Sequence, residues 1–272
     1  GHQVVGVDNL NDAYDTRLKR WRLAQLEENQ NFRFQQLDIA DREAISARFK
    51  ADSKTSDGPG IDQKPYSAVI NLAARAGVRP SVENPQAYYR TNCDGVLNLL
   101  DLCRDFGVAK FVQASTSSLY GASNRLPYTE DDNTDRPLSP YAASKKAAET
   151  LAYTYHHLHG LDITAFRYFT VYGPAGRPDM SVFRFVRRIA EGEPIVVFGD
   201  GTQSRDFTYV DDIARGTVAG IKPFGYEVIN LGSDRPVKLS SIIEQIGQRL
   251  GREPVIEYLP GHPADVPATW AN

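Results

Sequence analysis

Long apolar runs and blocks of basic residues are both missing from this 272-residue sequence. No apolar run approaches the roughly 18 residues that a membrane-spanning helix needs. The 31 basic and 34 acidic residues give a net charge of −3, which argues against electrostatic binding to nucleic acid or to a membrane surface. With 41% hydrophobic and 24% charged residues, the composition is typical of a globular protein.

Cysteine is scarce as well, and the histidines are not grouped. Cys93 and Cys103 are the only two cysteines, ten positions apart in a segment with a helical pattern. We therefore expect no disulfide and a reducing, cytoplasmic location. The five histidines have no metal-like spacing with cysteines or carboxylates, so we expect no metal site.

Apolar, β-rich runs alternate with helical patterns along the chain. The runs predict strands at Val4–Val7, Phe32–Leu37, Ala68–Leu72, Lys110–Ala114, Ile163–Phe169, Ile195–Phe198 and Val228–Leu231. The patterns between them predict helices at Asp15–Glu28, Arg42–Phe49, Pro85–Phe106, Pro140–His159, Val182–Glu191, Asp211–Ala219 and Ser240–Leu250. This alternation predicts an α/β fold with a doubly wound parallel sheet.

The alternation becomes less regular, and richer in proline and arginine, from about Asp179 onward. We predict a main domain at residues 1–178 and a smaller C-terminal lobe at residues 179–272, with segments at about 205–232 returning to the main sheet. The polar stretch Lys50–Lys64 is expected to form a surface loop.

An acidic residue directly after the first strand points to a dinucleotide site. In such folds an acidic residue closing the second strand bonds the adenosine ribose, about 20 residues after a glycine-rich turn that holds the pyrophosphate. Asp8 fits that place, but no G-x-G-x-x-G or G-x-x-G-x-x-G follows a strand here, so in this interpretation the turn precedes Gly1. Asp8 alone could simply cap a turn. The strand ends Asp38-Ile39 and Asn71–Ala74 favour the nucleotide cleft, because small side chains allow close approach.

Tyr141 and Lys145 lie four residues apart on one face of the predicted helix Pro140–His159. A nearby cation favours phenolate over phenol, so the tyrosine can act as a general base toward an alcohol. The spacing is common by chance, and a surface pair is the alternative. The hydroxyl-rich segment Ser115–Ser118, at the end of a central strand, favours the catalytic interpretation, because donors to a substrate oxygen belong there.

Six motifs follow one another in a fixed order. They are Asp8, Asn71-Leu72-Ala73-Ala74, Ser115-Thr116-Ser117-Ser118-Leu119-Tyr120-Gly121, Tyr141-x-x-x-Lys145, Arg167-Tyr168-Phe169-Thr170-Val171-Tyr172-Gly173-Pro174 and Arg205-Asp206-Phe207-Thr208-Tyr209-Val210-Asp211-Asp212. As an ordered set they resemble the extended short-chain dehydrogenase/reductase family of NAD-dependent nucleotide-sugar epimerases and dehydratases. The resemblance implies a Rossmann-like main domain that binds NAD, a smaller lobe that binds the nucleotide sugar, and a homodimer formed through two long helices.

The resemblance also implies roles for individual residues. The catalytic group comprises Thr116, Tyr141 and Lys145. The NAD-binding group comprises Asp8, Asn9, Asn11, Asp38, Ile39, Leu72, Ala73, Ala74, Asn92, Ala114, Tyr141, Lys145 and Tyr168. The group expected to bind the UDP-sugar comprises Arg79, Ser117, Ser118, Thr170, Arg177, Phe198, Arg205 and Asp265.

The hydroxyl cluster and one arginine bear on the reaction. Ser117 and Ser118 stand where dehydratases of this family carry Asp-Glu and where UDP-glucuronate decarboxylases carry a Glu, so the resemblance implies epimerisation without a further acid–base carboxylate. The segment around Arg177 is similar to UDP-glucuronate 4-epimerases, and a guanidinium suits a substrate carboxylate. Local pairing of Arg177 with Asp179 is the alternative.

The implied reaction is the C4 epimerisation of UDP-glucuronate to UDP-galacturonate through a 4-keto sugar, for capsule or cell-wall polysaccharide. One alternative is a UDP-glucose or UDP-N-acetylhexosamine 4-epimerase, or another enzyme that forms a 4-keto sugar. A second is a non-catalytic protein that binds a nucleotide sugar or NAD. The presence of Thr116, Tyr141 and Lys145 together argues against the second alternative.

Overall fold

A computed structural model describes residues 2–54, 64–122, 124–261 and 265–272, which form two compact units. The first unit comprises Gly1–Ser115, Ser139–Phe166 and Thr217–Ile229, and the second comprises Thr116–Leu138, Arg167–Gly216 and Asn230–Asn272. Because their segments interleave, no single cut along the chain separates the units. The role of each unit in binding stays a prediction.

Parallel strands form the centre of the first unit. They are β1 (Val4–Asp8), β2 (Phe32–Gln36), β3 (Ala68–Asn71), β4 (Lys110–Thr116), β5 (Asp162–Tyr168) and β9 (Tyr226–Leu231). β1 pairs in parallel with β2, and β3 pairs in parallel with β4 in a sheet of order β3-β4-β5-β9. The parallel α/β sheet expected from the sequence is therefore confirmed.

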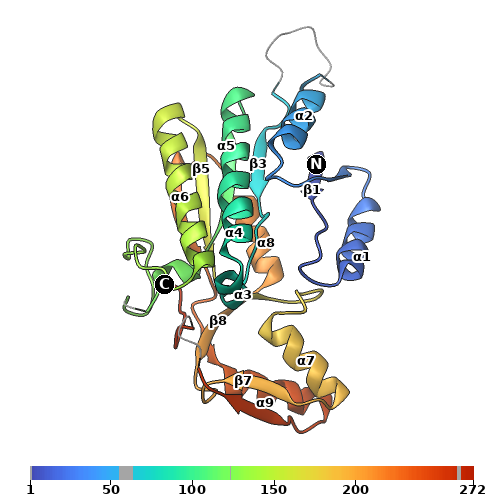
Figure 1. Cartoon of the computed structure of the whole chain (residues 1–272), viewed down its shortest axis with the longest axis vertical. Coiled ribbons are helices and arrows are strands. Elements are labelled where there is room, and N and C mark those ends of the chain that lie inside the picture. Colours follow the sequence, from blue (N-terminus) through green and yellow to red (C-terminus); the bar gives the residue numbers. More distant parts are fainter. Residues whose placement is uncertain (1, 55–63, 123, 262–264) are drawn as a thin grey trace. The chain divides into compact units, whose positions relative to one another are not determined.

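Helices flank these strands, and α5 and α6 lie side by side (Figure 1). The helices of the first unit are α1 (Thr16–Glu27), α2 (Arg42–Ser53), α3 (Val78–Glu83), α4 (Pro85–Tyr89), α5 (Gly95–Asp105) and α6 (Pro140–His159). The helix α8 (Val210–Ala219) begins in the second unit and enters the first at Thr217. The core beneath them is made of apolar side chains such as Leu100, Phe111 and Ile163, all fully buried. No helix in the described ranges is long and apolar enough to cross a membrane.

The helix predicted over Pro85–Phe106 is present from Pro85 to Asp105, but it is not α-helical throughout. A π-helical turn at Arg90–Asp94 separates α4 from α5. Such turns insert an extra residue into a helix and often occur at functional sites. Here the turn places Asn92 in the interior, where its side chain bonds the backbone of Arg75.

The helix α6 follows the bounds expected from its sequence. Ser139 Oγ accepts a 3.2 Å hydrogen bond from Ala142 N, and Pro140 occupies the first turn. Gly160 ends the helix in the left-handed conformation, with φ 65°, which costs glycine little. These caps fix which face of α6 points into the first unit.

The second unit has short strands and two longer helices. Its elements are a 3₁₀ turn at Ser117–Tyr120, β6 (Thr170–Tyr172), α7 (Ser181–Glu191), β7 (Ile195–Phe198), β8 (Ser204–Tyr209), β10 (Pro236–Lys238), α9 (Leu239–Leu250) and β11 (Ile256–Leu259). The sheet order is β10-β8-β6, with β10 antiparallel and β6 parallel to β8, and β11 pairs in parallel with β7. α7 and α9 pack together (Figure 1) over a core that includes Phe185, Ile195 and Ile243.

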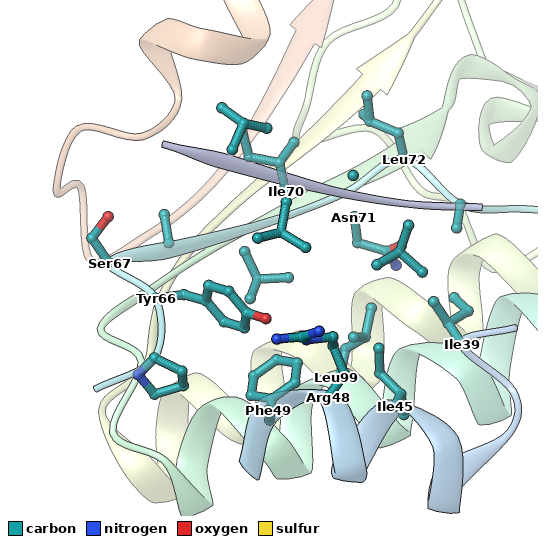
Figure 2. Close-up of a pocket in the computed structure, with 18 of the residues that line it drawn as sticks. Ile39, Ile45, Arg48, Phe49, Tyr66, Ser67, Ile70, Asn71, Leu72 and Leu99 are labelled. Atoms are coloured by element: carbon teal, nitrogen blue, oxygen red, sulfur yellow. The ribbon is translucent and has the colours of Figure 1, made fainter. Parts of the chain in front are cut away.

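A cavity of about 680 Å³ lies between β1 and β3 in the first unit. Figure 2 shows its lining, which combines apolar side chains with Arg48 and Tyr66. Val4 N donates to Asn31 O and Asp8 O accepts from Leu37 N, both on the side of β2. Alternate residues of a parallel strand bond the same neighbouring strand. The backbone groups of Val5 and Val7 therefore point to the edge of β1 that faces away from β2. In the described residues β1 and β3 belong to different sheets and do not pair with each other.

Candidate functional site

The carboxyl end of β1 brings four of the expected cofactor residues together. Asp8 is exposed, and its Oδ1 accepts a 2.6 Å hydrogen bond from Leu10 N. Asn9 Nδ2 donates to Asp38 Oδ2 at 3.2 Å, and Asn9 Oδ1 accepts from Asn11 N at 3.1 Å. These contacts hold two carboxylates and two amides at one strand end, where hydroxyl groups of a ribose could bond to them.

The end of β3 is held by a buried asparagine from the π-helical turn. Asn92 Oδ1 accepts from Arg75 N at 2.8 Å, while its Nδ2 donates to Arg75 O and to Ser144 Oγ, each at 2.9 Å. Asn92 thereby links the loop after β3 to α6, which also makes it a structural residue. In the same loop Leu72 is exposed, and Ala73 and Ala74 are partly buried.

The cavity between β1 and β3 is not the expected cofactor cleft. Of the residues assigned to NAD, only Ile39, Leu72 and Ala73 line it. Ile39 is also part of the apolar core.

Tyr141 and Lys145 occupy the first turns of α6. Lys145 is 3% exposed, and its Nζ donates a 2.8 Å hydrogen bond to Ala114 O at the end of β4. Burial lowers the pKa of Lys145 to about 8, although the carboxylate of Glu149 opposes that shift. The lysine is therefore still mostly a cation at neutral pH. Tyr141 is partly buried, and its ring meets Tyr88 edge-on at 6.2 Å between centroids.

The hydroxyl cluster begins at the end of β4 and continues into the 3₁₀ turn. Ser115 is 4% exposed, and its Oγ has no hydrogen-bond partner among the described residues. Thr116, the first residue of the second unit, accepts a 3.2 Å hydrogen bond from Ser118 N through its Oγ1. Ser117 is buried and Ser118 is partly buried. Of the residues predicted to be catalytic, Thr116 belongs to the second unit, and Tyr141 and Lys145 belong to the first.

Arg177 lies on the loop between β6 and α7, beside a local carboxylate. Its Nε donates to Asp179 Oδ1 at 3.0 Å, and its Nη2 forms a close ion pair with the same group. The local pairing that the sequence left open is present. In the same unit Tyr168 ends β5, Thr170 begins β6 and Phe198 ends β7, each partly buried.

Arg205 and Asp265 come from distant parts of the chain and interact within the second unit. Arg205 Nη1 donates to Ser204 O at 2.8 Å and to Pro267 O at 3.4 Å. Burial lowers the pKa of Arg205, and the carboxylate of Asp265 acts in the opposite direction. Of the remaining arginines assigned to the substrate, Arg79 lies on α3 in the first unit.

Sequence reasoning missed two buried residues that organise these groups. Ser144 Oγ accepts a hydrogen bond from Asn92 Nδ2 and donates one to Tyr141 O at 2.7 Å. Its signal in the sequence was its position between Tyr141 and Lys145. Asp206 is fully buried in β8, and its signal in the sequence was its place in the Arg205–Asp212 motif.

The residues of the first unit fit a dinucleotide. Asp8 Oδ2 accepts no hydrogen bond from the described residues, so an exposed acceptor is available beside Asn9 and Asn11. The small residues Ala73 and Ala74 follow β3. The Oγ of Ser115 is buried and forms no hydrogen bond with the described residues. A buried group of this kind is costly unless something bonds to it.

Comparison with known proteins agrees with this assembly. The family model described as "NAD dependent epimerase/dehydratase family" matches residues 1–232. A UDP-glucuronate 4-epimerase from Thermodesulfobacterium geofontis (strain OPF15) is 57% identical over 273 residues, which cover 100% of this chain and 80% of that protein.

Two solved structures show the same fold. A UDP-glucuronic acid 4-epimerase from Bacillus cereus, in complex with UDP-glucuronic acid and NAD, has a TM-score of 0.86 and 35% identity, covering 100% of this chain and 82% of that one. A UDP-glucose 4-epimerase from Thermotoga maritima, with UDP-glucose, has a TM-score of 0.84 and 30% identity, with coverages of 100% and 82%. The Rossmann-like architecture is therefore confirmed, and the chain belongs to the NAD-dependent epimerase/dehydratase family.

Proposed function

We propose that this protein catalyses the NAD-dependent C4 epimerisation of a UDP-sugar, with UDP-glucuronate and UDP-galacturonate as the two epimers. The observation that carries the proposal is the placement of Lys145. It is a buried cation tied to the end of β4 and one helical turn beyond Tyr141. The relative from Thermodesulfobacterium geofontis, named for this reaction, supports the choice of sugar.

The first unit would hold the cofactor. Asp8, with Asn9 and Asn11, would bond the adenosine ribose, and Ala73 and Ala74 would allow close backbone approach after β3. When bound, NAD supplies an acceptor for the hydride of C4. Because C4 would regain a hydride within the same turnover, the overall reaction would involve no net oxidation.

Tyr141 and Lys145 would move the proton. The Lys145 ammonium favours the phenolate form of Tyr141, which takes the proton from the sugar 4-hydroxyl as C4 loses its hydride. Loss of one proton and one hydride leaves a ketone at C4. After the ketone presents its other face, Tyr141 returns the proton to the oxygen as C4 regains hydride, and the configuration is inverted.

Thr116 would hold the C4 oxygen. Its Oγ1 already accepts from Ser118 N, which leaves the hydroxyl hydrogen to bond the sugar oxygen. Since Ser117 and Ser118 carry no carboxylate, the cluster offers no additional acid or base for elimination of water.

A uronic acid adds one requirement. The 4-keto form is a β-keto acid, which loses carbon dioxide when the breaking bond aligns with the carbonyl π system, so the site must restrain the carboxylate. Ser117, Ser118, Thr170 and Arg177 are the groups proposed to do so. Arg177 would reach the carboxylate by sharing or leaving its contact with Asp179.

The test is product analysis. Protein loaded with NAD is incubated separately with UDP-glucuronate and UDP-glucose, and the products are resolved by chromatography and NMR. The proposal predicts UDP-galacturonate from the first sugar. A UDP-pentose would mean decarboxylation, conversion of UDP-glucose alone would mean a neutral-sugar epimerase, and binding without any product would mean a non-catalytic protein.

We further infer a cytoplasmic homodimer that supplies UDP-galacturonate to polysaccharide synthesis. Exposed apolar side chains on α4 and α6, namely Tyr89, Tyr153 and Leu158, support a helical interface. Light scattering after size exclusion should give twice the chain mass, and Leu158→Asp should lower it to one chain. A monomeric wild-type protein would contradict this part of the proposal.

A further inference from the structure

Asp206 lies in the middle of β8 and is 0% exposed. Its two carboxylate oxygens accept five hydrogen bonds. Ser233 N and Ser233 Oγ donate to Oδ1 at 2.7 Å each, and Thr208 Oγ1 donates to it at 3.3 Å. Asp234 N and Ala271 N donate to Oδ2 at 3.1 Å each. Among the described residues Asp206 forms no ion pair, so only hydrogen bonds from uncharged groups hold this buried side chain.

These donors come from two segments far apart in the sequence. The loop after β9 contributes Ser233 and Asp234, and Asp234 adopts the left-handed conformation with φ 57°. The C-terminal segment contributes Ala271. The packing at this junction is close, because a Cβ added at Gly232 would lie 2.5 Å from Ala271 Cβ and 2.9 Å from Asp206 Oδ2. Side-chain volume is therefore excluded where the three segments meet.

The C-terminal segment that Asp206 fastens also reaches Arg205. Ser204 N donates to Pro267 O at 3.1 Å, and Thr269 N donates back to Ser204 O at 3.2 Å. Arg205 Nη1 contacts Pro267 O, and Asp265 interacts electrostatically with the guanidinium. Arg205 and Asp206 are neighbours on one strand, so their side chains point to opposite faces. Arg205, which interacts with Asp265, therefore lies on one face of β8. Asp206, which binds Ser233, Asp234 and Ala271, lies on the other face.

We propose that Asp206 is a positioning residue for the nucleotide part of the substrate, because it fastens the C-terminal segment beside β8 and so sets Asp265 against Arg205. The inference rests on the proposed function, in which Arg205 and Asp265 contact the UDP group. Asp206 itself touches no substrate. Its loss should weaken nucleotide binding and leave the chemical step intact.

The test replaces the carboxylate by an amide of the same shape. In Asp206→Asn, whichever way the amide turns, its NH₂ group faces backbone N–H donors of Ser233 or of Asp234 and Ala271. We expect the dissociation constant for UDP, measured by calorimetry on NAD-loaded protein, to rise about tenfold. The KM for UDP-glucuronate should rise in parallel, while kcat stays within about twofold of wild type.

Asp212→Asn is the matched control, because Asp212 is an exposed carboxylate of the same motif that forms a local ion pair with Arg215. Its UDP affinity should equal that of wild type. Unchanged UDP affinity in Asp206→Asn would overturn the inference. The inference would also be overturned if kcat and NAD affinity fell as much as UDP affinity and all three losses matched a fall in melting temperature. That result would indicate a purely structural role.

If Asp206→Asn does not fold, Ser233→Ala carries the test. It removes one donor to Asp206 and the acceptor of a long contact from Arg235 N, and it leaves the backbone donors to Asp206 in place. Weaker UDP binding than in Ser240→Ala, a substitution of an exposed serine, supports the inference, and equal binding overturns it. Wild-type protein that binds no UDP would instead contradict the proposed function and the inference with it. Wild-type UDP binding with an unaltered Asp206→Asn contradicts the inference alone.

Discussion

Lys145 Nζ donates a 2.8 Å hydrogen bond to the carbonyl oxygen of Ala114, joining α6 to the end of β4. The bond holds the ammonium at the end of β4, and Lys145 lies one helical turn beyond Tyr141. Because the lysine is buried, its charged form is disfavoured, and its pKa falls to about 8. The insertion of the Lys145 side chain between α6 and β4 therefore explains both the position of its ammonium group and its lowered pKa.

The lowered pKa of Lys145 predicts how stability depends on pH. Between about pH 8 and 10.5 the unfolded chain keeps a proton that the folded lysine has lost, so the free energy of unfolding rises with pH across this window. Lys145→Met removes that contribution. Urea unfolding at a series of pH values should show the wild type gaining stability relative to the variant as pH rises from 8 to 10.5. Burial raises the pKa of Cys93 to about 11, but this thiol is present in both proteins and affects both profiles. Parallel profiles would contradict the prediction.

Tyr141→Phe should abolish most of the turnover. The substitution keeps the ring that packs against Tyr88 and removes only the group that exchanges a proton with the sugar. General acid–base catalysis contributes about 10²–10⁴ in rate, so kcat should fall by at least about 100-fold while NAD and UDP still bind. Tyr258→Phe, at an exposed tyrosine on β11, is the control and should keep wild-type activity. Wild-type turnover in Tyr141→Phe would mean that another group is the base.

The sequence was most informative where structure is set locally. Ser139, Pro140 and Gly160 define the ends of α6, so both the helix and the register of Tyr141 and Lys145 could be predicted. The strand β8 was not predicted, because its Ser-Arg-Asp start lacks an apolar pattern and its pairing partners, β6 and β10, are distant in sequence. The π-helical turn between α4 and α5 was also not predicted, because it leaves the helical pattern of the sequence intact and depends on the long-range hydrogen bonds of Asn92.

The sequence also did not predict the role of Asp206, because the hydrogen bonds of this residue are long-range. Asp206 receives donors from positions 27, 28 and 65 residues further along the chain, which no local pattern reports. Arg177 shows the opposite case: its contact with Asp179 spans two residues, and the sequence already offered that pairing as an alternative.

Arg177→Ala should affect the charged substrate selectively. A guanidinium bound to the C6 carboxylate contributes a charge-assisted hydrogen bond, so its loss should lower kcat/KM for UDP-glucuronate by about tenfold or more. Any residual activity on UDP-glucose should change little, because that sugar has no carboxylate. Arg187→Ala, which breaks an exposed ion pair with Glu191 on α7, serves as the control. Unchanged kcat/KM for UDP-glucuronate would remove Arg177 from the substrate site and leave it as the partner of Asp179.

Asn92→Ala should destabilise the protein more than a comparable asparagine substitution. The side chain of Asn92 makes three hydrogen bonds, two to Arg75 and one to Ser144, and it is fully buried. Its removal leaves the backbone N–H and C=O of Arg75 without these partners, at a cost of about 1–3 kcal/mol for each buried group. Asn98→Ala is the matched control, because Asn98 is also buried but makes one hydrogen bond, 3.0 Å to Ile39 O. Urea unfolding should give the larger loss for Asn92→Ala. Because Ser144 in turn bonds Tyr141 O, turnover per folded molecule should also fall in Asn92→Ala and not in Asn98→Ala. Equal losses of stability in the two variants, with equal turnover, would show that Asn92 does not link the loop after β3 to α6.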